Sequence, residues 1–365
     1  MKKCKIKDVI EKEFKGLWGT DFDNNGIPVI KTNNMTYEGR INFSDICYRN
    51  ISLDDAKENL LQKGDLIIEK SGGTKTHSVG YVNIFEGIDN KFVCNNFILP
   101  IRPKKDLVIP KFLFWQLHSM YKTERFSDCF NKTTGIQNLQ KKTYFDKEIY
   151  LYDISIQKQI ANHLDTIQAA IDNKQQQLKE LDELVKSRFI EMFGDQKENF
   201  KRFYLSEAAT KIFAGGDRPE DTSDFQTEDY PYPVFANAET NKGLLCFSKT
   251  FQVDTECVTI AARGCTVGYT EVRNQKFTPV VRLITIIPKE DIKALFLKYY
   301  LDLELKIEGN GAAQPQLTVP NVKLYKIYIP PLSLQNDFVS FVQQIDKSKF
   351  VVISTKNYKF MILYK

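Results

Sequence analysis

A long polar segment with a heptad pattern divides the chain almost in half. From Ile160 the large apolar residues recur at steps of 4, 3, 4, 7, 3 and 4, which is typical of a helix that packs along one narrow seam. With Ser155 as N-cap and Gly194 as the stop, the pattern predicts a helix of about 38 residues and about 57 Å. The seam residues are Ile160, Leu164, Ile167, Ile171, Leu178, Leu181 and Val185.

The second half of the chain repeats the pattern of the first. Without a gap, a shift of 178 residues places Leu139 on Leu317 and Gln157 on Gln335. The repeat predicts a second helix that begins near Ser333. An apolar seam is stable only when another surface covers it, so we expect the two helices to pack together. The apolar residues of the second helix are Leu334, Phe338, Phe341 and Ile345.

Two globular segments accompany these helices. Residues 1–153 and residues 201–331 share one order of features: strands, a glycine-bearing loop, strands and a helix. For example, DLIIEKSGG in the first segment resembles CVTIAARGC in the second. We therefore expect the α/β class, with two domains of mixed strands and helices joined by two long helices at 154–200 and 332–365.

Composition excludes several classes of protein. A net charge of +5, from 51 basic and 46 acidic residues, is compatible with nucleic-acid binding. No apolar run approaches the roughly 20 residues of a membrane span, and no apolar stretch follows the basic start, so we expect a cytoplasmic protein. Seven cysteines without a C-x-x-C pair and three isolated histidines predict neither a disulfide framework nor a metal site.

The connector carries a family resemblance. The segment LYDISIQKQIANHLDTIQAAIDNKQQQLKELDELVKSRFIEMFGD resembles the central conserved region of the specificity subunit of type I restriction–modification enzymes. IYIPPLSLQNDFVSFVQQID resembles the distal conserved region, and GAAQPQL resembles the stretch that the family carries shortly before it. The resemblance covers nearly the whole chain in the family's order of domain, helix, domain, helix.

The resemblance implies a function that the composition alone does not. In this family each target-recognition domain reads one half of a bipartite site in double-stranded DNA. The two helices pack as an antiparallel coiled coil with a pseudo-two-fold repeat, fix the gap between the half-sites and dock modification subunits, usually two. Those subunits methylate adenine with S-adenosylmethionine, and restriction subunits use ATP and Mg²⁺. The specificity subunit itself has no catalytic residues and binds no cofactor.

The end of the chain departs from the family pattern after Ser348. Residues 349–365 are β-branched and aromatic and show no heptad, which is typical of a truncation or a shifted reading frame. The alternative is a short terminal strand. In either case we expect the seam from Leu178 to Phe193 to lack its partner helix.

Candidate DNA contacts were chosen by residue type and by glycine content. Arg, Lys, Asn and Gln read base edges, hydroxyl and amide groups bind phosphates, and glycines let the backbone approach them closely. The alternative for each loop is an ordinary surface turn. In the first domain the candidates are Lys31, Asn33, Asn34, Lys70, Ser71, Gly72, Gly73, Thr74, Lys75, Lys132, Thr133 and Thr134. In the second domain they are Arg218, Asn237, Arg263, Gly264, Thr266, Arg273 and Gln314.

Enzyme motifs are approached but not completed. The stretch GTKT lacks the order of a phosphate-binding loop, and FAGGD has Asp where a cofactor-binding F-x-G-x-G has glycine. Asp291 with Glu304 and Lys306 imitates a nuclease carboxylate cluster, but Glu304 and Lys306 lie in a stretch with a helical pattern, where a solvated helix face is the simpler explanation. Two alternatives remain: a degenerate or phase-variable specificity subunit that does not assemble fully, and a helical scaffold protein without a nucleic-acid role.

Overall fold

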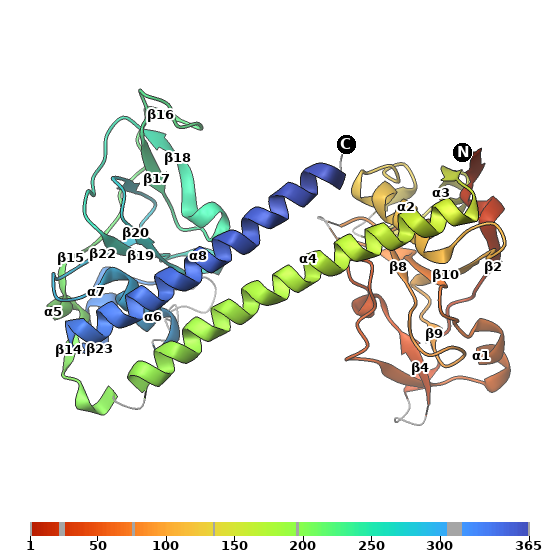
Figure 1. The fold of residues 1–365 in the computed structure, drawn as a ribbon, viewed down its shortest axis with the longest axis horizontal. Helices are drawn as coiled ribbons and strands as arrows, with labels where there is room; N and C mark the ends of the chain where they lie inside the picture. Colours follow the sequence, from red (N-terminus) through yellow and green to blue (C-terminus); the bar gives the residue numbers. More distant parts are fainter. Residues whose placement is uncertain are drawn as a thin grey trace. The chain divides into compact units, whose positions relative to one another are not determined.

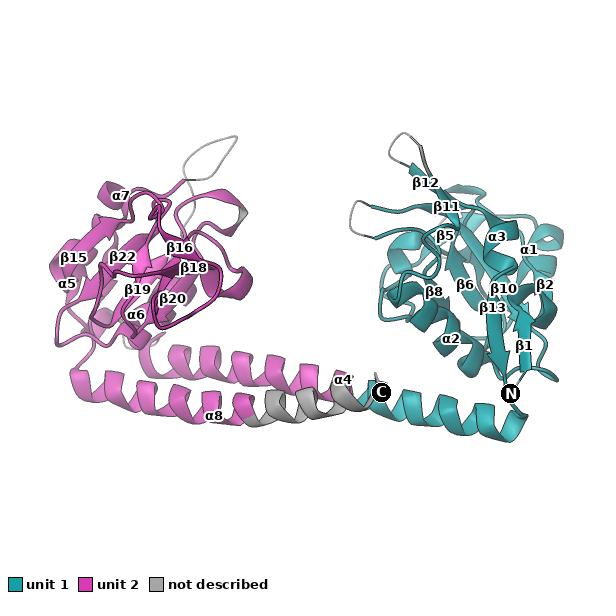
Figure 2. Cartoon of the chain, turned by 90° about the horizontal axis from the view of Figure 1, so that it is seen from above, with its two compact units in different colours: residues 1–170 teal, residues 171–365 magenta. Residues whose placement is uncertain are grey.

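The chain forms two compact units, Met1–Ala170 and Ile171–Lys365 (Figure 2). The computed structural model describes residues 2–21, 26–74, 77–133, 136–194, 197–304 and 316–363. Both units mix strands and helices, which confirms the predicted α/β class. No helix in these described ranges is long and apolar enough to cross a membrane.

Unit 1 is built on two sheets that share a buried central region. The first sheet has the order β2-β10-β6-β8 and the second has the order β3-β5-β4-β9. Figure 1 labels β2, β8 and β10 of the first sheet and β4 and β9 of the second. All four residues of β6 are buried because side chains alternate between its faces: Leu66 and Ile68 pack under α2, whereas Ile67 packs in a separate core. The strands are β1 (Lys2–Lys5), β2 (Ile10–Glu13), β3 (Thr20–Asp21), β4 (Ile27–Ile30), β5 (Cys47–Asn50), β6 (Leu66–Glu69), β7 (Ser71–Gly72), β8 (Val82–Ile84), β9 (Val93–Cys94), β10 (Ile98–Pro103), β11 (Phe130–Thr133), β12 (Ile136–Leu139) and β13 (Glu148–Leu151). The helices are α1 (Leu53–Asn59), α2 (Pro110–Lys122), α3 (Lys141–Phe145) and the first part of α4 (Ile154–Phe189).

Unit 2 repeats this architecture. Its sheets have the orders β15-β22-β19-β20 and β16-β18-β17-β21, and the last pair of the second sheet is parallel, as is β4 with β9 in unit 1. Its strands are β14 (Arg202–Tyr204), β15 (Ala209–Ala214), β16 (Thr222–Ser223), β17 (Tyr232–Phe235), β18 (Leu244–Ser248), β19 (Cys257–Ile260), β20 (Thr270–Arg273), β21 (Thr278–Pro279), β22 (Ile284–Pro288) and β23 (Lys326–Tyr328). Its helices are the rest of α4, α5 (Leu205–Ala208), α6 (Ala294–Leu303), α7 (Val319–Lys323) and α8 (Leu332–Leu363).

The internal repeat also appears in single backbone hydrogen bonds, whose donors Leu139 and Leu317 are 178 residues apart. Leu139 N donates to Lys70 O at 2.8 Å, and Leu317 N donates to Ala262 O at 2.8 Å. Both bonds tie the segment that follows the central strand of a unit, at Lys70 after β6 and at Ala262 after β19, to a segment that comes much later in the chain. The internal repeat therefore extends from sheet order to individual contacts.

A buried glutamine attaches each long helix to its own domain. In unit 1 the Gln157 side chain accepts from Ile109 N at 2.9 Å and donates to Leu107 O and Tyr152 O at 3.0 and 2.7 Å. Ile109 is the N-cap residue of α2. The glutamine thus supplies the acceptor that the start of α2 lacks and fixes α4 to it.

Gln335 makes the same three contacts in unit 2. Its side chain accepts from Lys293 N, the N-cap residue of α6, at 2.9 Å. It donates to Asp291 O at 3.1 Å and to Pro330 O at 2.9 Å. Both glutamines are 0% exposed. We call this pair of equivalent contact sets the glutamine latches.

The seam of α4 has different partners in its two parts. In unit 1, Ile160 packs against the core beneath α2, and Leu164 lines a cavity beside the same helix. The prediction that these two residues face the second helix is therefore wrong, because the latch turns that face toward the domain. Ile167, Ile171 and Leu178 are half-buried.

In unit 2 the later seam residues pack against α8. Leu181 and Val185 join one core cluster with Leu334, Phe338, Phe341 and Ile345. These seam residues therefore lie where the sequence predicted them, against the second helix.

The two helix segments of unit 2 run antiparallel. The Phe189 and Phe338 rings lie 5.4 Å apart, and Lys349 Nζ lies 2.6 Å from Asp182 Oδ1. A step back along α4 therefore corresponds to a step forward along α8. The expectation that the seam from Leu178 to Phe193 lacks a partner is wrong from Leu181 onward, because the start of α8 pairs with the end of α4.

The ends of the long helices also differ from expectation. α4 begins at Ile154, so Ser155 lies in its first turn and is not the N-cap, and π-helical turns continue it to Gly194. α8 reaches Leu363, so the terminal strand considered for residues 349–365 is wrong. The segment contains neither proline nor glycine, and a nucleated helix extends at little cost through β-branched residues.

The latches predict a specific loss of stability. Gln157→Ala leaves one buried donor and two buried acceptors without partners, so we expect the free energy of unfolding to fall by about 3 kcal/mol. Gln159→Ala, on the exposed side of the same turn, is the matched control and should change it by less than about 0.5 kcal/mol. Urea unfolding of the full chain measures both. Equal effects of the two substitutions would contradict a role for the latch.

Candidate nucleic-acid interface

The glycine loop of unit 1 follows β6 and closes on the hairpin of β11 and β12. β7 pairs with Asn138 and Gln137 of β12, and Ser71 Oγ donates to Asn138 Oδ1 at 2.8 Å. The Gln137 amide also donates to Thr74 O at 3.3 Å. The structure therefore brings together two predicted segments that are far apart in the sequence. Figure 2 shows this hairpin on the side of unit 1 away from α4.

Backbone conformation explains the two glycines of this loop. Gly72 and Gly73 have φ of +130° and +71°, where side chains other than hydrogen are strained. A Cβ at Gly72 would lie 2.8 Å from Glu69 Oε1. The glycines therefore let the loop turn directly over a buried carboxyl group.

Glu69 supports the loop from below. Its side chain is 7% exposed, and its carboxylate accepts a hydrogen bond from the Gly73 backbone N–H. Burial raises the pKa of Glu69 to about 7, although the bond from Gly73 opposes that rise. The pKa of Lys70, the residue after Glu69, is lowered mainly by burial and to a smaller extent by the positive charge of Lys141.

Aromatic residues that the sequence analysis missed close the loop. Thr74 N donates to His77 O at 2.7 Å, and His77 N donates to Thr74 Oγ1 at 3.0 Å. The His77 ring stacks on Tyr37 at 3.8 Å, and Tyr37 contacts Tyr81 at 4.8 Å. Because these rings come from separate parts of the chain, no local motif could have indicated their contact.

The segment after β4 contains a structural asparagine. Asn34 is 1% exposed, donates to Asn42 O and Asp45 O, and accepts from Lys31 N. The prediction of Asn34 as a DNA contact is therefore wrong, since its amide is fully used inside the fold. Lys31 is half-buried and its Nζ lies 3.3 Å from Asp45 Oδ2, whereas Asn33 is exposed.

In unit 2, Asn237 holds two loops together. Its Oδ1 accepts from Ala262 N at 2.7 Å, and its Nδ2 donates to Val281 O. These bonds give Asn237 a structural role, because they set the spacing of the loops that follow β19 and β21. Its amide retains a second N–H and a second lone pair, so a contact between Asn237 and DNA stays a prediction.

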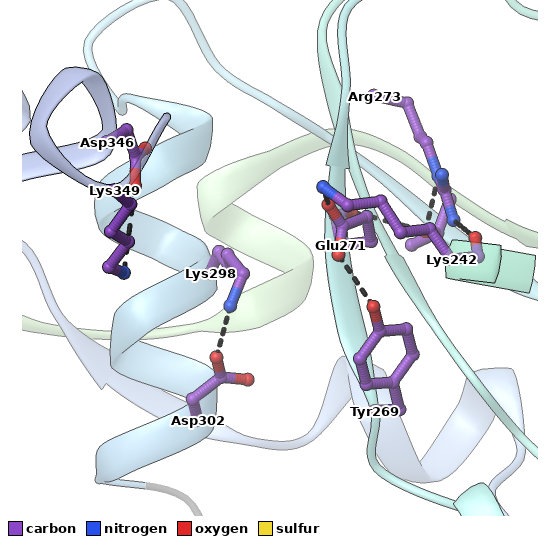
Figure 3. Close-up of polar contacts among 9 residues, drawn as sticks. Lys242, Tyr269, Glu271, Arg273, Lys298, Asp302, Asp346 and Lys349 are labelled. Atoms are coloured by element: carbon purple, nitrogen blue, oxygen red, sulfur yellow. Dashed lines mark hydrogen bonds and ion pairs between the residues drawn. The ribbon is translucent and has the colours of Figure 1, made fainter. Parts of the chain in front are cut away.

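Arg273 is also structural. It is 4% exposed, its guanidinium lies 3.7 Å above the Phe235 ring, and it donates to Lys242 O at 2.5 Å and to Thr259 Oγ1 at 3.3 Å. Figure 3 shows the guanidinium directed at Lys242. Burial lowers the pKa of Arg273. Its prediction as a DNA contact is wrong, because the side chain stabilises a turn from inside.

The turn that Arg273 supports has an unusual backbone. Asn241 and Lys242 have φ of +50° and +53°, and Gly243 follows with +79°. Lys242 Nζ bridges to Glu271 at 2.8 Å, and Glu271 also accepts from the Tyr269 hydroxyl at 2.8 Å (Figure 3). These contacts explain how a strained turn persists.

The remaining candidates of unit 2 lie on the surface. Arg263 and Gly264 are exposed, and Gly264 has φ of +80° with no atom within 4 Å of an added Cβ. The Arg263 guanidinium donates two hydrogen bonds, of 3.0 and 3.3 Å, to the Gln316 side-chain oxygen when the Gln316 amide is oriented with that oxygen toward Arg263. Arg218 donates to Thr222 Oγ1 at 2.8 Å. Thr266 is half-buried in the 3-10 turn that follows Arg263.

The remaining predicted DNA contacts lie in β11 or outside the described residues. Lys132 and Thr133 lie in β11, opposite Gln137 and Ile136. Three predicted contacts lie outside the described residues: Lys75, Thr134 and Gln314.

Glu69 makes the stability of unit 1 dependent on pH. Its folded pKa lies above the value of about 4.5 expected for the unfolded chain, so folding favours the protonated form. The stabilisation that the protonated Glu69 contributes to the fold is complete below pH 4.5 and is lost as the pH rises through about 7. We expect Glu69→Gln to raise the free energy of unfolding at pH 8 by up to about 3 kcal/mol, and not at pH 4.5.

Urea unfolding at both pH values measures this difference, with the exposed Glu58→Gln as matched control. An equal effect of Glu69→Gln at the two pH values would contradict a buried, shifted carboxyl group.

Comparisons with known proteins agree with this architecture. The family model for the type I restriction modification DNA specificity domain matches residues 1–183 and 197–358. A Mycoplasma pneumoniae protein named as a type I specificity subunit, S.MpnORF89P, is 36% identical over 149 residues, 41% of this chain. The match spans 44% of that relative, less than half of its length.

Two further comparisons cover nearly the whole chain. A Methanocaldococcus jannaschii protein, named as the specificity subunit of the type I restriction enzyme MjaX, is 23% identical over 93% of this chain and 85% of its own. The crystal structure of a type I restriction–modification S subunit from M. genitalium has a TM-score of 0.62 at 16% identity and covers 99% of this chain and 93% of that one. The latter likeness shows the fold alone. Because the family model covers both halves, the chain belongs to the family of type I restriction modification DNA specificity domains.

Proposed function

We propose that the chain is the DNA-specificity subunit of a type I restriction–modification system and that each unit reads one half of a bipartite site. The observation that carries this proposal is one scaffold present twice with different loops. The central strand is followed by Ser71-Gly72-Gly73 in unit 1 and by Arg263-Gly264-Cys265 in unit 2. Equal scaffolds with unlike side chains suit two unlike half-sites in double-stranded DNA.

The interior of each unit supports this reading. The buried side chains of Asn34 and Arg273, and the half-buried side chain of Asn237, hold the loops in place. Braced loops hold their exposed arginines and lysines in place, and such preorganisation reduces the entropy cost of binding. Phosphate contacts would orient each unit on the duplex, and base contacts would supply the sequence preference.

The long helices would act as spacer and docking surface. Leu184 on α4 and Ile190 in its π-helical extension are 47% and 54% exposed. Large apolar side chains on an exposed helix support association with another protein. In this proposal that protein is the modification subunit, usually in two copies, and restriction subunits join through the complex.

The chemistry would belong to these partners. S-adenosylmethionine would be bound by the modification subunits, and ATP and Mg²⁺ would serve the restriction subunits. We assign no catalytic role to this chain, which would contribute recognition and geometry.

Two other functions make different predictions. A helical scaffold protein would not retain DNA at moderate salt, whereas a specificity subunit would bind with a steep salt dependence. A degenerate subunit would bind DNA without assembling a functional complex. The antiparallel packing of α8 on α4 favours assembly over this second alternative.

Methylation mapping tests the proposal. The chain is co-expressed with its modification subunit in a host that lacks DNA methylation, and N6-methyladenine is located by single-molecule sequencing. We expect one bipartite motif with two unlike halves at a constant gap, because two unlike domains are attached to one spacer. The modification subunit alone is the control.

The other outcomes separate the alternatives. Co-purification with the modification subunit without methylation would indicate a degenerate subunit. The absence of both methylation and co-purification would contradict the proposal.

A further inference from the structure

A short strained segment in unit 2 presents an arginine that no sequence motif marked. Val281 and Arg282 have φ of +53° and +65°. For a β-branched residue such as valine this conformation is a genuine outlier that costs about 1–3 kcal/mol. The Val281 side chain is 48% exposed, so burial of this side chain contributes little against the cost.

Four hydrogen bonds hold this segment. Val281 N donates to Gly216 O at 2.8 Å, Arg282 N donates to Gly215 O at 3.1 Å, and Leu283 N donates to Val280 O at 3.0 Å. Asn237 Nδ2 donates to Val281 O. The surrounding structure therefore enforces the strained conformation.

Gly215 makes this close approach possible. A Cβ at that position would lie 2.5 Å from the Pro279 carbonyl group. Only glycine lets the chain just after β15 come near enough for Gly215 O to accept from Arg282 N. Gly215, the first glycine of FAGGD, thus serves backbone packing in this fold.

The same bonds gather three arginines on one edge of unit 2. The Asn237 side chain joins Val281 O to Ala262 N, and each of these groups stands one residue before an arginine, Arg282 or Arg263. Gly216, which accepts from Val281 N, lies two residues before Arg218. We call Arg218, Arg263 and Arg282 the arginine edge. Asp217, Glu220 and Asp221 lie on the segment that carries Arg218, and Lys249 Nζ lies 2.7 Å from Asp221 Oδ2. Three arginines and this lysine therefore stand with three carboxylates, so the edge stays positive by one charge.

The three guanidinium groups differ in how they are held. Arg263 is braced by the Gln316 amide, and Arg218 by Thr222. Arg282 is exposed, and no other described residue pairs with its guanidinium. Bidentate recognition of a base requires a fixed guanidinium plane, whereas a phosphate accepts a positive charge from many directions.

We propose that Arg282 is a DNA-phosphate contact of the second domain, and that the braced Arg263 beside it reads a base. This rests on the proposed function of the chain. The strained backbone would fix where the Arg282 charge meets the duplex, and Arg263 would then lie against the groove. In this proposal Arg282 positions the domain along the duplex, and Arg263 supplies the sequence preference.

Equilibrium binding to two duplexes tests this assignment. The full chain, complexed with its modification subunit, is titrated with a duplex carrying the mapped motif and with one whose second half-site is scrambled. Because each phosphate contact contributes about 0.9 to the salt exponent, Arg282→Ala should weaken binding to both duplexes about tenfold near 0.1 M salt. The slope of log K against log salt should become shallower by about 1.

Two further variants separate phosphate from base recognition. Arg282→Lys should restore most of the affinity, because lysine supplies a point charge to a phosphate. Arg263→Lys should reduce the preference for the motif, since lysine lacks the planar fork. Arg202→Ala, which removes an exposed arginine from β14, is the matched control and should leave affinity and slope unchanged.

The outcomes distinguish this inference from the proposed function. If the complex without any substitution shows no preference for the duplex that carries the motif, the proposed function fails. If the complex does prefer the motif and Arg282→Ala matches Arg202→Ala, the inference about Arg282 is overturned. It is also overturned if Arg282→Ala weakens only the motif duplex, because that result identifies a base contact.

Discussion

The glutamine latch is the interaction on which the rest of this structure depends. Gln157 and Gln335 each join the first turn of a long helix to the start of a domain helix, and every partner atom belongs to the backbone. A contact that uses only backbone atoms places no demand on the side chains of the domain. The latch therefore keeps a helix fixed to its domain while the sequence of that domain varies, as the proposed function requires.

Away from the long helices, polar side chains beneath the surface hold the loops in fixed conformations. Glu69 lies under the glycine loop of unit 1, and Asn237 and Arg273 lie under the loops of unit 2. Burying such groups is costly unless they are hydrogen-bonded, and here their bonds hold backbone conformations that are rare or strained, such as the turn at Asn241 and Lys242. The rigid part of each domain thus includes these loops and not only the sheets.

Much of the fold could be predicted from the sequence, because a duplication leaves its register in the chain. The shift that aligns Gln157 with Gln335 also aligns Leu139 with Leu317, which donate equivalent backbone hydrogen bonds. The expectation that the end of α4 lacks a partner was wrong because, in an antiparallel pair, the start of α8 lies against the end of α4. Residue type also misled: Asn34 and Arg273 have the chemistry of DNA contacts, but their burial depends on tertiary contacts that no local pattern encodes. The strain at Arg282 was invisible for the same reason.

A domain exchange followed by methylation mapping tests the central claim most directly. Residues 201–331 are replaced by the corresponding domain of the Methanocaldococcus jannaschii relative, while both long helices, including Gln335, are kept. Because the latch contacts only backbone atoms, the account predicts that one half of the methylated motif changes while the other half and the gap stay constant. A change in both halves, or in the gap, would contradict the claim that the domains are independent readers on a common spacer.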